Sequence, residues 1–145
     1  MQLEATKRNE ITASRAKSLA WELKPFFPSI DTTAIEHAAK LRKSRFPPSL
    51  ECKKRLTETE YEDAVLSVLE SGDYAAYVLE DSLGQERADK VRAIIYNHLE
   101  HFDGKGPFGK HGDEIPAEAY ILNLSALIQN LIEGNPNRYG PGGGI

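Results

Sequence analysis

Apolar residues recur at spacings of three and four along most of this 145-residue chain, and that periodicity restricts the fold more than any other feature. Such spacing gathers apolar side chains on one face of a helix. No stretch alternates apolar and polar residues as a half-buried strand does, and no hairpin dipeptide joins two alternating runs. The sequence therefore predicts an all-α fold, built as a compact bundle of about six helices.

Prolines, glycines and capping residues divide this pattern into separate helices. We expect helices over about 4–24, 31–44, 57–72, 73–80, 85–102 and 116–134. Asp31 or Ser29 can cap the second of them, because a side-chain oxygen there can accept a hydrogen bond from the first turn. Gly72 is expected to end the third helix. Asp73 would then cap the fourth.

Large apolar and aromatic side chains are expected to fill the core that these helices enclose. Trp21 and Tyr61 are assigned to core positions on their helices. Tyr74, Tyr77 and Val78 supply the apolar residues of the short fourth helix, and Phe102 completes the apolar face of the fifth. These assignments follow from helical spacing alone.

Length and composition indicate one globular domain. Hydrophobic residues make up 40% and charged residues 28%, which excludes a disordered acidic chain, and no apolar run is long enough to cross a bilayer. A single Cys52 excludes an internal disulfide and a Cys-based zinc site. The first residues lack the pattern of a signal peptide. We therefore expect a cytoplasmic domain over 1–134, no membrane contact and a flexible tail over 135–145.

Charge is divided unevenly along the chain. Residues 1–55 have a net charge of +6 and residues 56–145 have a net charge of -10. The basic half ends in a dense run, which consists of Lys40, Arg42, Lys43, Arg45, Lys53, Lys54 and Arg55. Such a run can attract phosphate groups, and a solvated face or a contact with the acidic half is the alternative. A pI of 5.6 and the lack of interleaved aromatic residues argue against nucleic-acid binding.

The stretch from His98 to Ile121, HLEHFDGKGPFGKHGDEIPAEAYI, carries the most chemical information. The end of a helix brings His98 and Glu100 next to Asp103, and a glycine-rich loop then leads to a new helix. Glycines permit positive φ and close backbone approach, so the loop could wrap a phosphate or a metal-bound ligand. A tight connector between two helices is the alternative.

This stretch resembles the HD-GYP family, whose members are all-helical, metal-dependent phosphodiesterases that act on cyclic di-GMP. The family motif reads HHExxDGxGYP, and the matching residues here are His98, Glu100, Asp103, Gly104, Gly106 and Pro107. Glu114, Ile115 and Pro116 then match the family's EEIP. Upstream, residues 39–51 (AKLRKSRFPPSLE) align without a gap on the family's HDIGKIGIPDSIL. The resemblance implies an HD-domain-like helical fold.

Several of the family's metal ligands are replaced in this chain. The replacements are Ala39 and Lys40 for the HD pair, Ser67 or Ser71 for a downstream His, Leu99 for the second His of HHE, and Ala126 for a late Asp. A site with two or three ions needs several His and carboxylate ligands. The resemblance with these losses implies a domain without catalytic residues, bound metal or cofactor.

We therefore expect a catalytically inactive HD-GYP-like signalling domain that binds a protein partner, such as another signalling domain, or a cyclic dinucleotide. The candidate ligand-binding residues are Lys40, Lys43, His98, Glu100, Asp103, Gly104 and Gly106. Lys40 is expected to be buried, either as part of a phosphate-binding pocket or in an ion pair with Glu100 or Asp103, because a buried charge requires a partner.

Two other functions stay open. The first is an active cyclic di-GMP phosphodiesterase with a rearranged metal site, and the second is a purely structural helical scaffold. A single zinc ion held by His98, His101, His111 and Asp103 is a further alternative, since His98 and His101 can share one face of a helix. Metal content and nucleotide binding separate these functions.

Overall fold

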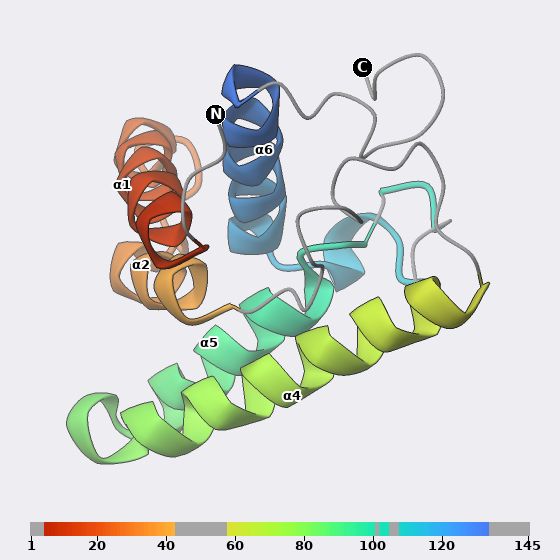
Figure 1. Ribbon diagram of the computed structural model, residues 1–145. Helices are drawn as coiled ribbons and strands as arrows, with labels where there is room; N and C mark the ends of the chain where they lie inside the picture. The colour runs from red at the N-terminus through yellow and green to blue at the C-terminus, as the bar shows by residue number, and fades with distance from the viewer. Residues whose placement is uncertain (1–4, 43–57, 101, 105–107, 134–145) are drawn as a thin grey trace.

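The computed structural model of this chain describes residues 5–42, 58–100, 102–104 and 108–133. Within these residues it contains five α-helices and one short 3₁₀ helix, and the all-α prediction is confirmed (Figure 1). The elements are α1 (Ala5–Leu23), α2 (Thr32–Leu41), α4 (Glu58–Leu83), α5 (Gln85–Asn97), η1 (Gly112–Glu114) and α6 (Ala117–Ile132). Two candidate site residues, Lys43 and Gly106, and the tail 135–145 lie outside the described residues.

The helices form two groups that pack on each other (Figure 1). One group contains α1, α2 and α6, and the other is the long hairpin of α4 and α5. Helix α2 joins the groups, because it packs on α1 and also contacts α4, α5 and α6. No helix among the described residues is long and apolar enough to span a membrane.

Small side chains allow α1 and α2 to approach closely. Ala13, Ala16 and Ala20 of α1 are fully buried, and so are Ala34, Ala38 and Ala39 of α2. The larger core side chains come from the other elements and from the start of α2; among them are Ile35, Ile94, Ile95 and Leu122. Helix α2 begins where expected, since Asp31 Oδ1 accepts a hydrogen bond from the Ala34 N–H at 2.9 Å.

Helix α4 is continuous over 26 residues, so the predictions that Gly72 ends one helix and that Asp73 caps another are wrong. Gly72 instead allows close packing between α4 and α5. A Cβ at Gly72 would lie 2.7 Å from two ring carbons of Tyr96, which is closer than carbon atoms pack. The Tyr96 hydroxyl donates a hydrogen bond to Asp73 and holds the ring in this position. Burial, together with this bond, raises the pKa of Tyr96 above 10.0.

The substitution Gly72→Ala tests this packing. Alanine favours a helix over glycine by about 1 kcal/mol, but here the ring of Tyr96 occupies the space of the new methyl group. We expect Gly72→Ala to lower the free energy of unfolding by about 1–2 kcal/mol in urea denaturation followed by circular dichroism. In a chain that also carries Tyr96→Ala, Gly72→Ala should raise the free energy of unfolding. A stabilising effect of Gly72→Ala in the wild-type chain would contradict this account.

Several large side chains lie at the surface and not in the core, contrary to prediction. Trp21 is 55% exposed, Phe102 is 69% exposed, and Tyr74, Tyr77 and Val78 are exposed as well. Small side chains explain the difference on α4, since Ala75 and Ala76 fill the positions that face α5. The fifth predicted helix is also shorter than expected, because α5 ends at Asn97, and Phe102 lies in the loop beyond it.

A buried ion pair joins the start of α1 to the end of α6. Arg8 Nε lies 3.2 and 3.0 Å from the two carboxylate oxygens of Glu133, and a second nitrogen of the guanidinium donates at 3.1 Å. The side chains of Arg8 and Glu133 are only 10% and 3% exposed. Gln129 donates to the same carboxylate and accepts from Arg15. Hydrogen bonds and an ion pair therefore join α1 to α6, in addition to apolar contacts.

Candidate functional site

The glycine-rich loop after α5 is built around the carboxylate of Glu100. This side chain is 3% exposed, and its Oε1 accepts a hydrogen bond from the Phe108 N–H at 2.5 Å. Its Oε2 is buried and has no hydrogen-bond partner among the described residues. Glu100 therefore joins the start of the loop to Phe108 from inside, and its Oε2 accepts no hydrogen bond from the described residues.

His98, the other candidate on this helix end, is also buried. Its ring is 4% exposed, and Nδ1 lies 2.6 Å from the carbonyl oxygen of Ile95. That distance makes Nδ1 the protonated nitrogen, because a carbonyl oxygen can only accept. The Nδ1–H bond fixes the orientation of the imidazole within the last turn of α5.

Asp103 and Gly104 lie at the outer part of the loop. The backbones of Asp103 and His111 form an isolated antiparallel bridge, and the Asp103 side chain is exposed. Gly104 has φ of +82°, and a Cβ there would collide with the ring of His111. The backbone approach that glycine permits is thus used by His111, a residue of the same loop. This contact agrees with a connector between two helices, and the described part of the loop does not test whether it also binds a ligand.

The far end of the loop is fastened to α6. The Tyr120 hydroxyl donates to the carbonyl of Gly112 at 2.9 Å, and its ring packs on Phe102 with centroids 6.0 Å apart. Burial and the carboxylates of Asp113 and Glu100 raise the pKa of Tyr120 above 10.0. Hydrogen bonds from the side chain and backbone of His111 lower the pKa of Glu114 below 4.5.

Lys40 is not buried, which corrects that prediction. Its side chain is 49% exposed, and its ammonium lies 3.7 Å from Glu36 Oε2, one turn earlier on α2. The ion pair is therefore with Glu36 and not with Glu100 or Asp103. Ala38 and Ala39 occupy the core side of α2, and the 100° turn per residue directs the next side chain outward.

Several positions that align with metal ligands of the HD-GYP family are buried in the packing of the helices, although Lys40 is exposed and Leu99 is only partly buried. Ala39 and Ala126 are 0% and 5% exposed, and the two serines that align with the downstream His are buried too. Ser71 donates its hydroxyl to the carbonyl of Val68 on its own helix at 3.0 Å. Among the described residues, no three His, Cys, Asp or Glu side chains are grouped so that they could hold a metal ion. The side chains at these positions do not fit a metal centre with two ions.

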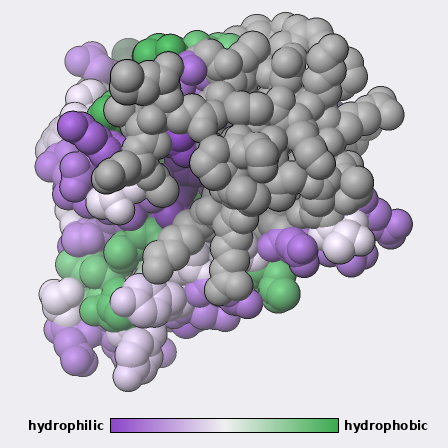
Figure 2. Space-filling view, in the orientation of Figure 1, coloured by the Kyte–Doolittle hydropathy of each residue, from purple (hydrophilic) through white to green (hydrophobic). Residues whose placement is uncertain are grey.

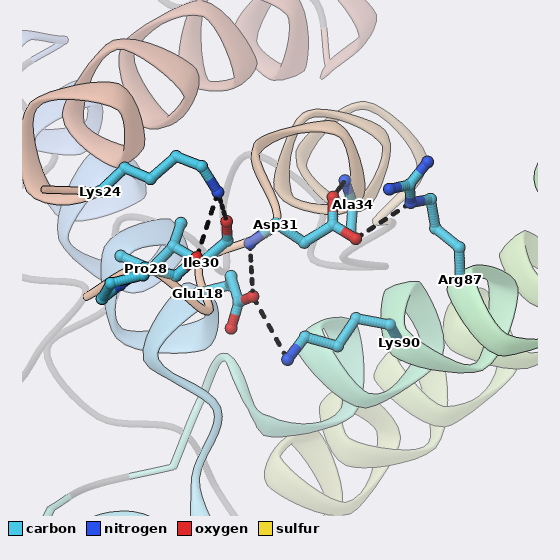
Figure 3. A network of polar contacts seen from close by, with 8 residues as sticks. All are labelled: Lys24, Pro28, Ile30, Asp31, Ala34, Arg87, Lys90 and Glu118. Carbon is cyan, nitrogen blue, oxygen red and sulfur yellow. Dashed lines mark hydrogen bonds and ion pairs between the residues drawn. The ribbon is translucent and has the colours of Figure 1, made fainter.

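A separate cleft of about 670 Å³ lies between the segment before α2 and the start of α5. Its lining comprises Ser29, Asp31, Leu83, Glu86, Arg87, Asp89 and Lys90. Figure 3 shows that charged groups at this cleft point toward one another. Arg87 Nε lies 3.0 Å from Asp31 Oδ2, and Lys90 Nζ lies 3.2 Å from Glu118 Oε2. Glu118 also accepts from the Asp31 N–H at 2.9 Å.

Two ion pairs of this network are compensated within the chain, Asp31 with Arg87 and Glu118 with Lys90. Burial raises the pKa of Asp31, but bonds from the Ala34 N–H and the Arg87 guanidinium outweigh it, so the pKa is below 3.8. Lys24 donates to the carbonyls of Pro28 and Ile30 and closes the end of α1 (Figure 3). The sequence indicated the Asp31 cap, but it carried no signal that Glu118, in the first turn of α6, would be 2% exposed.

The chain matches no protein-family model, and comparison with curated proteins and with solved structures gives no match. The likeness to the HD-GYP family accordingly rests on the sequence motifs around the glycine-rich loop.

Proposed function

We propose that this chain is a non-hydrolytic, HD-GYP-like signalling module that acts by binding a protein partner. One observation carries the proposal: three of the positions aligned with the family's lost ligands hold side chains that serve helix packing. Ala39 and Ala126 have no donor atom, and the Ser71 hydroxyl is bonded to its own helix.

The chemistry of phosphodiester hydrolysis supports this proposal. A metal ion supplies the nucleophile by lowering the pKa of bound water, and a centre of two or three ions needs several His and carboxylate ligands. His98 and Glu100 keep the family's residue types, but these two side chains supply too few ligands to hold two ions. Lys40 stands at the position of the family's Asp, and it is an exposed cation paired with Glu36.

The single Cys52 agrees with a reducing, cytoplasmic setting, in which bacterial signalling modules of this kind work. A binding role also agrees with the number of large side chains at the surface, among them Trp21, Phe26 and Tyr77. Aromatic residues are enriched at protein interfaces. A cyclic dinucleotide is the competing ligand, and a binding measurement distinguishes it from a protein partner.

The test is hydrolysis of cyclic di-GMP by the purified chain, followed by chromatography with added Mn²⁺, Fe²⁺ or Mg²⁺. Metal content is measured by elemental analysis of the same protein. We expect no product with any of the ions and metal far below one ion per chain. An active HD-GYP domain, assayed in parallel, shows that the conditions support turnover.

Turnover that disappears in His98→Ala, with the helical circular dichroism signal unchanged, would overturn the proposal and favour the active phosphodiesterase. Tight binding of cyclic di-GMP without turnover, measured by calorimetry, would replace the protein partner by a nucleotide ligand. Lys40→Ala tests in the same measurement whether Lys40, a candidate ligand-binding residue that pairs with Glu36 on the surface, contributes to that binding.

A further inference from the structure

One side of α4 exposes apolar and aromatic side chains over a length of about 18 Å. They are Leu66 (55% exposed), Tyr74 (53%), Tyr77 (80%) and Val78 (41%). Their spacing places them on the same side of the helix, and Ala75, Ala76 and Leu79 of the other side are buried. Single exposed apolar residues are common, but a row of them on one helix indicates a contact surface.

All the charged side chains of α4 are acidic. The helix contains eight Asp and Glu residues and no Lys or Arg among its 26 residues. Asp73 is compensated by Arg92 of α5, at 3.3 Å. Among the residues that the structure describes, Glu62, Asp63 and Asp81 are exposed and make no ion pair. The exposed aromatic row therefore lies in a strongly negative surface.

We propose that this side of α4, here called the α4 face and defined by Leu66, Tyr74, Tyr77, Val78 and Asp81, binds a basic segment of a partner protein. The proposal rests on the proposed function and names the chemistry of its partner. The segment carries Arg or Lys residues between apolar side chains. Its charge is complementary to that of the helix.

Each group on the α4 face suits such a segment. Guanidinium and ammonium groups form charge-assisted hydrogen bonds with carboxylates such as that of Asp81. The same cations can lie over the rings of Tyr74 and Tyr77. Leu66 and Val78 provide apolar contact for the residues between the cations. Phosphate-rich surfaces, whether nucleic acid or anionic lipid, are repelled by the same carboxylates.

The experiment uses the full chain and a short fluorescein-labelled peptide of Arg and Leu residues at helical spacing. Binding is followed by fluorescence anisotropy at about 0.15 M salt, where weak long-range attraction is screened. The test variant is Tyr77→Ala with Asp81→Asn, which removes one exposed ring and one charge. We expect its affinity to fall at least about tenfold, or about 1.4 kcal/mol.

The matched control is Trp21→Ala with Glu22→Gln on α1, which also removes one exposed ring and one exposed charge. It should change the affinity by no more than about twofold, because α1 lies outside the α4 face. All four positions are exposed, so both variants should keep the helical circular dichroism signal of the wild-type chain.

Three results would overturn the proposal. These are the absence of binding, equal weakening in the two variants, and a dimer of the chain alone that Tyr77→Ala dissociates in sedimentation experiments. Equal weakening would indicate general charge attraction, and such a dimer would assign the α4 face to a second copy. The hydrolysis assay reports on the proposed function separately, so failure of one proposal does not hide the result of the other.

Discussion

Arg8→Met should lower the free energy of unfolding by about 3–5 kcal/mol, the largest effect expected of a single substitution in this chain. The guanidinium makes three hydrogen bonds to Glu133, whose side chain is 3% exposed. Methionine keeps the length of the side chain but leaves the carboxylate buried without its cation. Urea denaturation at pH 7 measures the loss, which corresponds to a fall in Tm of roughly 10 °C.

Two further variants separate charge from packing in this pair. Arg8→Met with Glu133→Leu removes both charges and should recover most of the loss, because neither charge is then buried alone. Lys17→Met breaks the pair with Glu36, whose side chains are 44% and 26% exposed, and should change stability by less than about 1 kcal/mol. A loss below about 0.5 kcal/mol for Arg8→Met would show that the buried pair contributes little.

Lys90→Met should lower the free energy of unfolding by about 2 kcal/mol, and Glu118→Gln by less than about 1 kcal/mol. The two partners differ in exposure, since Lys90 is 37% exposed and Glu118 is 2% exposed. Without Lys90 a buried carboxylate loses its cation. With glutamine at 118, the amide oxygen can still accept from the Asp31 N–H, and Lys90 turns toward solvent. Urea denaturation of both variants at pH 7 measures the difference.

Which of the two substitutions causes the larger loss of stability separates two explanations. A larger loss in Glu118→Gln than in Lys90→Met would mean that the ion pair itself, and not the burial of an uncompensated charge, determines the stability. Lys110→Met serves as the control, because Lys110 is exposed in the loop, and its removal should stay within about 0.5 kcal/mol.

Local chemistry explains which features of the fold could be read from the residues. The boundaries of α1 and the Asp31 cap of α2 were predictable, because proline geometry and a capping carboxylate act within a few residues. The start of α5 near residue 85 was predicted as well, and Gly84 is its local signal. Gly84 has φ of +85° and forms the whole connection between Leu83 and Gln85. Glycine suits such a conformation far better than other residues.

Candidate site residues were harder to place, because their environment depends on distant parts of the chain. His98 and Glu100 are buried within the loop region, whereas Lys40 and Asp103 are exposed. The resemblance to the HD-GYP family placed Lys40 near the other three, but an alignment does not give the direction of a side chain relative to other helices. Lys40 points outward because alanines on the adjoining positions of α2 face the core.

The sequence by itself determined an all-α chain, its helical faces and its division into a basic and an acidic half, because periodicity and charge are properties of the residues. Only the tertiary structure decided that Gly72 lies inside a long helix, where the ring of Tyr96 from α5 requires a residue without Cβ. It also decided that Glu118 is buried and that Tyr77 is exposed. Each of these outcomes depends on which helix packs on which, and that is set by contacts between residues far apart in the chain.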